Sequence, residues 1–268
     1  MKLLFLDLDD TLLCSDKTIS KKNLDAIRNM TENGHGLVLA TGRPFYSCMK
    51  LAKEYGFVGK NYYIAAFNGG QIVDTSSMKE IYHAGLDKEN ARFIFDEAHK
   101  FNIPVQTYSD EFVLTERENE FIKWYTERIR MPYKVVPDAI EAVGANPFKC
   151  VAGHIDDHEA LENFQGYISP KLSKNVITLF SNPHILEFGP LNASKGIAVK
   201  VLCEKLKVDL KDSIAAGDEE NDISMIETAG IGVAMKNGTE HTKNFADYIT
   251  ENDNDNDAIA EIIYKFIL

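Results

Sequence analysis

The stretch that decides the fold is Leu3-Leu4-Phe5-Leu6-Asp7-Leu8-Asp9-Asp10-Thr11. Four consecutive apolar residues run directly into a cluster of carboxylates. A short, continuous apolar run predicts a strand that is buried on both faces, as in a parallel α/β sheet. The aspartates at its end would then lie at the carboxyl edge of the sheet, where open α/β folds bind their ligands.

The three aspartates of this stretch allow two arrangements. On an extended strand, Asp7 and Asp9 would point to the same side because they are two residues apart, whereas a turn at Asp10-Thr11 would separate them. In either arrangement the neighbouring acids repel one another, so a cation or hydrogen-bond donors must hold the cluster. A strand followed by an Asp-rich loop without a function is the alternative interpretation of this stretch alone.

Strands and helices alternate on both sides of a long central stretch. Strands are predicted over 36–40, 62–67, 213–216 and 231–235, and helices over 20–33, 44–55, 195–206, 222–229 and 257–266. Each of the strands followed by a loop ends in small or polar residues. This order predicts an α/β fold, with a Rossmann-like, doubly wound parallel sheet as its core.

The central stretch has a different rhythm. It combines predicted helices at 89–101, 118–129 and 159–164 with a hairpin at 105–108 and 112–115 and strands at 149–152 and 176–180. Hairpins mixed with helices indicate a separate α+β module. We therefore predict a discontinuous core domain of residues 1–84 and 185–268, with an inserted domain of residues 85–184.

Length and composition limit the class of protein. The chain has 268 residues, a hydrophobic fraction of 44% and a net charge of −12, values that favour a globular protein over a nucleic-acid or anionic-membrane binder. No apolar run is long enough to span a membrane, and the four apolar residues after Met1-Lys2 are too few for a signal peptide. The four cysteines are widely spaced and are predicted to be free thiols. We expect a cytoplasmic monomer or weak homodimer that binds a small molecule.

Polar residues of types that can take part in catalysis or ligand binding stand at the ends of the predicted core elements. They are Asp7 and Asp9, Thr41, Lys195, and Asp218 with Asn221 and Asp222. The set suits phosphoryl transfer, which needs a nucleophile, a cation, donors for the phosphoryl oxygens and a proton source for the leaving oxygen. Hard oxygen ligands favour Mg²⁺ as the cation.

Four motifs of the chain together resemble the haloacid dehalogenase (HAD) superfamily. They are Asp-Leu-Asp-Asp-Thr at 7–11, Ala-Thr-Gly-Arg-Pro at 40–44, Ser-Lys-Gly at 194–196 and Gly-Asp-Glu-Glu-Asn-Asp at 217–222. The insertion between the second and third motifs is similar to the α/β cap of the Cof-type phosphatases, the subfamily IIB. This resemblance covers essentially the whole chain.

The resemblance implies a role for each motif residue. Asp7 would attack phosphorus and form an aspartyl phosphate, while Asp9 would protonate the leaving group and then activate water. Phosphate would be bound by Thr41, Gly42, Lys195 and Asn221. Mg²⁺ would be held by Asp7, the backbone carbonyl of Asp9, Asp218 and Asp222. Residues that could line the site are Asp10, Arg43, Asn68 and Gly69.

The chain departs from the family at Asp10, where glycine is usual. Aspartate tolerates turn geometry better than most residues, so we expect activity to survive. The predicted reaction is Mg²⁺-dependent hydrolysis of small phosphomonoesters such as sugar phosphates. The alternatives are a phosphosugar mutase of the same superfamily, a phospho-acceptor signalling domain, and a binding protein without catalysis.

The inserted domain is expected to select the leaving group, and Tyr108, Arg117 and His184 are candidate contacts. Two other patterns are interpreted as structural. The pair His154 and His158 is typical of surface or cap residues, and 252–257 reads as a turn before the last helix, because it lacks the glycine and glutamate of a calcium loop.

Overall fold

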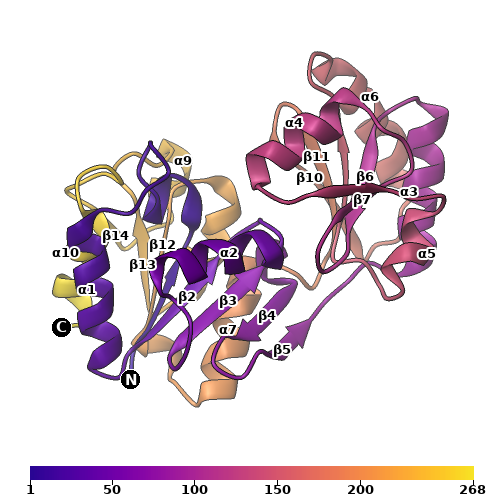
Figure 1. Cartoon of the computed structure of the whole chain (residues 1–268). Helices are drawn as coiled ribbons and strands as arrows, with labels where there is room; N and C mark the ends of the chain where they lie inside the picture. Colours follow the sequence, from indigo (N-terminus) through magenta and orange to yellow (C-terminus); the bar gives the residue numbers. More distant parts are fainter. The chain divides into compact units, whose positions relative to one another are not determined.

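The computed structural model describes residues 1–268, which divide into two compact units. The core unit comprises Met1–His83 and Ser194–Leu268, and the inserted unit comprises Ala84–Ala193. Both chain termini belong to the core unit (Figure 1). None of the helices is both long and apolar enough to cross a bilayer.

The core unit is built on one eight-stranded sheet of order β14-β13-β12-β1-β2-β3-β4-β5. Its strands are β1 Leu3–Leu6, β2 Gly36–Ala40, β3 Tyr62–Ala66, β4 Gln71–Asp74, β5 Lys79–His83, β12 Ser213–Gly217, β13 Ile231–Ala234 and β14 Tyr248–Ile249. Neighbours from β14 to β3 are parallel, whereas β4 and β5 add an antiparallel edge. The α/β core sheet is therefore confirmed, and the sequence missed its edge strands, namely the β4–β5 hairpin and the short β14.

Helices cover both faces of this sheet. They are α1 Lys21–Glu32, α2 Phe45–Tyr55, α7 Lys195–Leu206, α8 Ile223–Thr228, α9 Glu240–Lys243 and α10 Ala258–Phe266. Leu3 and Phe5 pack in one cluster with Val199 and Leu202 of α7. Because side chains alternate along a strand, Leu4 and Leu6 face the opposite side. All four β1 residues are fully buried, which explains the continuous apolar run at the start of the chain.

Capping residues at the helix ends explain the predicted helix boundaries of the core unit. Ser20 caps α1 by accepting the N–H of Asn23, and Ser194 caps α7 by accepting the N–H of Ile197. Gly56 ends α2 in the left-handed conformation, with φ +77°. These residues fix where each helix starts or stops relative to the sheet.

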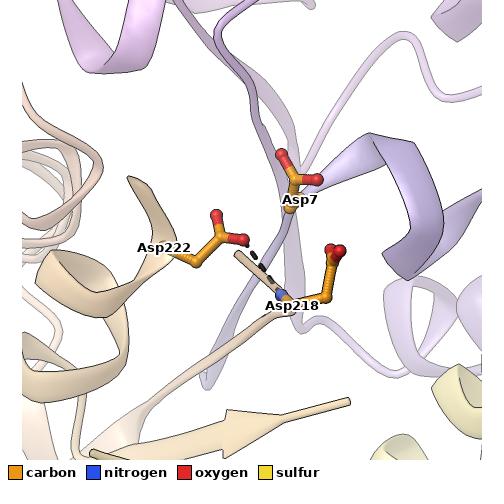
Figure 2. Close-up of side chains that lie close together, drawn as sticks. All are labelled: Asp7, Asp218 and Asp222. Atoms are coloured by element: carbon orange, nitrogen blue, oxygen red, sulfur yellow. Dashed lines mark hydrogen bonds between the residues drawn. The ribbon is translucent and has the colours of Figure 1, made fainter. Parts of the chain in front are cut away.

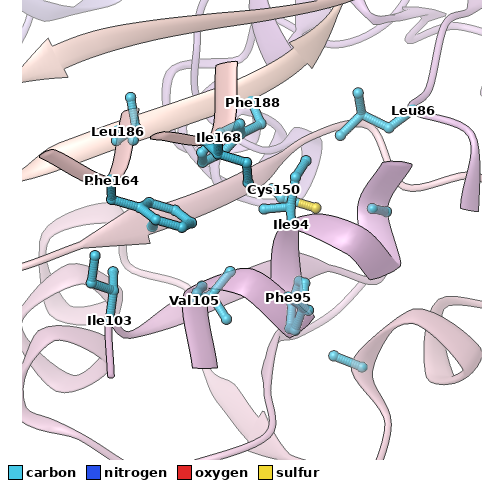
Figure 3. Close-up of a cluster of buried hydrophobic side chains, with 14 of the residues drawn as sticks. Leu86, Ile94, Phe95, Ile103, Val105, Cys150, Phe164, Ile168, Leu186 and Phe188 are labelled. Atoms are coloured by element: carbon cyan, nitrogen blue, oxygen red, sulfur yellow. The ribbon is translucent and has the colours of Figure 1, made fainter. Parts of the chain in front are cut away.

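The inserted unit has a six-stranded sheet of order β10-β11-β9-β6-β7-β8. Its strands are β6 Val105–Tyr108, β7 Val113–Thr115, β8 Tyr133–Val135, β9 Cys150–Gly153, β10 Val176–Asn182 and β11 Ile185–Pro190. Its helices are α3 Lys88–Lys100, α4 Glu120–Ile129, α5 Ala139–Val143 and α6 His158–Ile168. The sheet packs on α3, α5 and α6 through a cluster that includes Phe95, Phe164 and Phe188 (Figure 3).

The end of the inserted unit differs from the sequence-based boundary at residue 184. The strand β11 pairs with β10 and β9 and so belongs to the inserted sheet, and the chain enters the core unit only at Ser194. The sequence interpretation placed 185–193 in the core because this segment follows Pro183 and precedes a clear helix start.

The three candidate leaving-group contacts differ in exposure. Tyr108 is buried, and its hydroxyl is 2.6 Å from the hydroxyl of Tyr125. The half-buried ring of His184 packs edge-on against Trp124. Tyr108 is therefore a packing residue of the inserted unit, His184 is partly exposed, and Arg117 is exposed. All four cysteines are free, as predicted, and all four are buried.

Candidate active site

Three carboxylates meet at the carboxyl edge of the core sheet. Asp7 directly follows β1, Asp218 directly follows β12, and Asp222 lies in the turn before α8 (Figure 2). The two strands are neighbours, with Leu6 opposite Ala216. One oxygen of each carboxylate lies within 4.8 Å of an oxygen of the other two. Parallel pairing thus brings together acids that are far apart in the sequence.

The position of Asp222 depends on the absence of a side chain at Gly217. A Cβ at Gly217 would lie 2.3 Å from the Asp222 side chain. The Asp222 carboxylate uses this space to accept the backbone N–H groups of Asp218 at 3.0 Å and Glu219 at 3.1 Å. Asp222 therefore closes the turn that carries Asp218.

Lys195 is the cation of this cluster. It is the first residue of α7 and is fully buried, and its ammonium donates to Asp7 Oδ1 at 2.5 Å and to Asp222 Oδ1. Burial alone would lower the pKa of Lys195, but the carboxylates of Asp222 and Asp7 outweigh it and raise that pKa above its ordinary value. Lys195 therefore stays protonated.

One ammonium does not balance three buried carboxylates. Burial, reinforced by the charge of Asp222, raises the pKa of Asp7 to about 7 although Lys195 opposes the shift. Burial and the charge of Asp7 raise the pKa of Asp218 to about 8. Oxygen-rich donors with excess negative charge fit a hard divalent cation such as Mg²⁺. Both Asp222 oxygens already accept hydrogen bonds, so Asp7 and Asp218 offer the freer ligand atoms.

The residues after β2 and β3 border the same edge. Thr41 is buried at the end of β2, and its backbone N–H donates to the carbonyl of Ala65 in β3 at 2.9 Å. The N–H of Asn68 donates to the Thr41 carbonyl at 2.9 Å, so the two loops are joined. A Cβ at Gly42 would lie 3.2 Å from Asn68 Oδ1, which places these residues in close contact.

The turn after β3 also reaches the helix that carries Lys195. Gly69 has φ +87°, and a Cβ there would lie 2.4 Å from the Ser194 carbonyl oxygen. Only glycine allows both this conformation and this approach. Asn221 is exposed, and its amide lies 3.5 Å from Asn68 Oδ1 across the edge. The four motif loops therefore converge.

Asp9 stands apart from the three-carboxylate cluster because the chain turns after Leu8. Its carboxylate pairs with Arg43 through two hydrogen bonds and with Lys17 at 3.3 Å. Burial alone would raise the pKa of Asp9, but the hydrogen bonds and charge of Arg43, with those of Lys17, lower it. Of the two arrangements considered from the sequence, the turn is the one present, because β1 ends at Leu6 and Asp10 has φ 59°.

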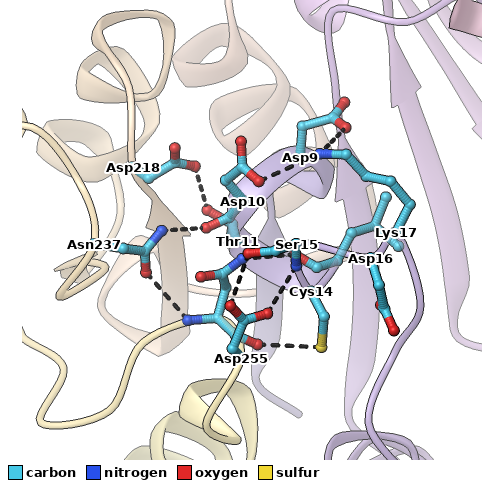
Figure 4. Close-up of polar contacts among 12 residues, drawn as sticks. Asp9, Asp10, Thr11, Cys14, Ser15, Asp16, Lys17, Asp218, Asn237 and Asp255 are labelled. Carbon is cyan, nitrogen blue, oxygen red and sulfur yellow. Dashed lines mark hydrogen bonds and ion pairs between the residues drawn. The ribbon is translucent and has the colours of Figure 1, made fainter.

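Asp10 occupies the turn in a conformation that suits glycine. It has φ 59° and ψ 12°, the left-handed region in which aspartate is tolerated better than most residues. Its carbonyl accepts the side-chain amide of Asn237 at 2.7 Å, and its carboxylate lies 3.3 Å from Lys17 (Figure 4). Asp10, which stands where the family usually has glycine, therefore preserves the turn.

Sequence reasoning missed three supporting residues. Thr11 donates its hydroxyl to Asp218 Oδ1 at 2.6 Å, while Lys17 and Asn237 hold the Asp9-Asp10 turn as described above (Figure 4). Thr11 stands inside the first motif and could have been singled out from its position. Lys17 and Asn237 lie in loops, and no local pattern marks them.

The carboxyl edge of this parallel sheet brings together carboxylates and a buried lysine, the groups that an α/β enzyme of the phosphoryl-transfer class needs. The chain matches a family model for the haloacid dehalogenase-like hydrolases over residues 4–263 and belongs to that family. The expected membership, with its Cof-type branch and phosphatase class, is confirmed, and the chain is a hydrolase of phosphoric monoesters.

Similar proteins cover the chain from end to end. A haloacid dehalogenase-like hydrolase from Bacteroides thetaiotaomicron has 32% identity and a TM-score of 0.92, covering 98% of each chain. Phosphatase YwpJ of Bacillus subtilis is 29% identical over 98% of this chain and 99% of its own. The Bacillus subtilis phosphatase YcsE, named for 5-amino-6-(5-phospho-D-ribitylamino)uracil, is 27% identical over 100% and 96%.

Proposed function

We propose that the chain hydrolyses small phosphomonoesters by attack of the Asp7 carboxylate on phosphorus. The observation that carries the proposal is the convergence of Asp7 with Lys195 and Asp218 at adjacent strand ends. The bond from phosphorus to the ester oxygen breaks as a bond to Asp7 forms. Water then releases phosphate and regenerates the carboxylate.

Each residue around Asp7 has a task in this scheme. Lys195 orients Asp7 and supplies a positive charge for the phosphoryl oxygens, and Thr41 and the Gly42 backbone offer further donors. Asp9 gives a proton to the leaving oxygen and later takes one from water. Asn221 fits a role in binding phosphate, with Asn68 and Gly69 lining the site.

Asp7 and Asp218 would hold Mg²⁺, with the Asp9 carbonyl as a further ligand and Asp222 as support. When bound, the ion neutralises charge on the phosphoryl group and lets both aspartates ionise at neutral pH. The inserted unit would select the leaving group, the role assigned to it from the sequence.

The substrate class is a phosphate on a small soluble metabolite. The ribitylamino-uracil relative supports including sugar-alcohol phosphates beside sugar phosphates. The phosphosugar mutase remains the alternative, because a mutase also keeps an acid at the position of Asp9.

The test is phosphate release from p-nitrophenyl phosphate and from a panel of sugar and sugar-alcohol phosphates, with Mg²⁺ and with EDTA. We expect Mg²⁺-dependent release that Asp7→Asn abolishes. Asp25→Asn, which changes an exposed carboxylate on α1, is the matched control and should leave activity intact. No release from any ester with Mg²⁺ would reject hydrolysis, and conversion between sugar-phosphate isomers would establish the mutase.

A further inference from the structure

A cavity of about 340 Å³ lies within the inserted unit. Its lining comes from the end of α3 and the start of β6, from the segment between β7 and α4, and from the turn after β9. This volume falls within the range of small-molecule sites, which is roughly 300–1,000 Å³. None of the motif residues of the core unit lines it.

The inner wall of the cavity is apolar and closely packed. Ile103 and Phe121 are buried there beside Pro104, Val105 and Ile155. The Phe121 ring occupies the space left by Gly153, since a Cβ at Gly153 would lie 1.9 Å from the ring. The wall can therefore pack against the apolar body of a ligand.

The rim carries an arginine without a charge partner. No carboxylate lies within 4.0 Å of the Arg117 guanidinium. Glu118 and Glu120 also line the cavity, and both pair with Lys123 rather than with Arg117, so that one lysine offsets part of their charge. Glu116 accepts the backbone N–H of Ala139 and lies 3.7 Å from His99. Arg117 is thus available to an anion.

The backbone that carries Arg117 is held in place. Its carbonyl accepts the Thr115 hydroxyl at 3.1 Å and the Asn119 side-chain amide at 2.9 Å. A fixed backbone reduces the entropy that an incoming ligand must overcome when it orders the guanidinium.

His154 presents a second donor to the cavity. Its Nδ1 accepts the backbone N–H groups of Asp156 at 3.3 Å and Asp157 at 3.1 Å. In the neutral ring the proton is therefore on Nε2, which is left to donate. Asp156 also lines the cavity, and its carboxylate makes no hydrogen bond or ion pair, so its charge opposes an anion.

We propose that this cavity binds a small organic anion with an apolar body, held by Arg117 and His154, as a site distinct from the aspartate cluster of the core unit. A carboxylate or a phosphoryl group provides the same anionic chemistry. The site requires no turnover, so it stands whether or not the proposed function holds.

The test is an NMR titration of the full chain in EDTA with benzoate, phenylphosphonate and the neutral analogue benzamide. We expect saturable backbone shifts at 115–121 and 154–156 with one or both anions and none with benzamide. Arg117→Gln should weaken binding about fivefold, the scale of a partly exposed charge pair. Asp156→Asn should strengthen it, because it removes the opposing charge.

Arg128→Gln is the matched control, since its guanidinium lies 5.8 Å from the Trp124 ring centroid, on the same helix but outside the cavity lining. It should bind as the unmodified chain does. The proposal is overturned by an absence of saturable shifts at the cavity, by shifts confined to residues of the core unit, or by equal affinities of the Arg117 and Arg128 variants.

Discussion

The guanidinium of Arg43 donates one hydrogen bond to each carboxylate oxygen of Asp9. Its Nε donates to Asp9 Oδ2 at 2.9 Å and its Nη2 to Asp9 Oδ1 at 2.6 Å. Such a bidentate pair fixes the plane of a carboxylate as well as its charge. Arg43 follows β2 and Asp9 follows β1, so the pair ties together two neighbouring loops of the site. In the proposed reaction, Arg43 is a positioning residue for the proton donor.

Removing Arg43 should harm poor leaving groups more than good ones. We expect Arg43→Ala to lower kcat for an alkyl phosphate by about 10- to 100-fold, because general acid catalysis contributes about 10²–10⁴-fold and depends on position. The loss for p-nitrophenyl phosphate, whose leaving group needs little protonation, should be smaller than about fivefold. Steady-state kinetics with both esters measures the difference, and Arg43→Lys should restore part of it. Equal losses for the two esters would contradict a positioning role.

Lys195 should be required for folding stability as well as for activity. Lys195→Met leaves Asp7 and Asp222 buried without their cation, which typically costs about 3–5 kcal/mol. Urea unfolding in EDTA measures this loss. Adding Asp222→Asn to Lys195→Met removes one of the two buried carboxylates that lack a cation and should recover part of the stability. If the double variant were less stable than Lys195→Met alone, charge imbalance would not be the cause.

Gly69 and Gly34 form a matched pair for testing the close approach at the site. Their φ angles are +87° and +85°, but a Cβ at Gly34 meets nothing within 4 Å, whereas one at Gly69 would meet the Ser194 carbonyl at 2.4 Å. Both alanine variants bear the left-handed strain of about 1–2 kcal/mol. Gly69→Ala should lose about 1–3 kcal/mol more through overpacking, and it should lower kcat because α7 carries Lys195. Equal unfolding free energies would argue that the turn can move away from α7.

The stability of the metal-free chain should fall as pH rises from about 5 to 8. Because burial raises the pKa of Asp218 to about 8, the folded chain keeps a proton that the unfolded chain, with an aspartate pKa of about 3.9, has already lost. Unfolding then releases a proton, so higher pH favours the unfolded state. Melting in EDTA should show a flatter pH dependence for Asp218→Asn than for Asp25→Asn. Added Mg²⁺ should raise Tm in the Asp25→Asn control and have little effect in Asp218→Asn.

The parts of the fold that could be predicted from the sequence are those that bury a continuous apolar run or carry an end signal. The strand Leu3–Leu6 and the helix that starts at Lys195 are of this kind. The hairpin β4–β5 escaped prediction because β5 is exposed or half-buried along its length, and its pairing partner alone makes it a strand. β11 escaped because its pairing with β9 is a tertiary property.

The candidate site likewise has features that could be predicted from the sequence and features that could not. The motif residues at the strand ends were named from the sequence, and the structure brings Asp7, Lys195 and Asp218 together. The direction of the Asp9 side chain was left open, since it depends on a turn in which Asp10 adopts φ 59°. Lys17 could not be anticipated because a single loop lysine gives no periodic signal.

The insertion of one unit within the other sets an order of events during synthesis. The inserted unit is one continuous segment, whereas β1 must wait for β12, its parallel neighbour from the far side of the insertion. Thr11 and Asp218, which share a hydrogen bond, are 207 positions apart. A ribosome adds about 5–20 residues each second, so the nascent chain exposes the unpaired edge of β1 for ten seconds or more. The aspartate cluster is therefore incomplete until β12 and Asp218, which follow the inserted unit, have been synthesised.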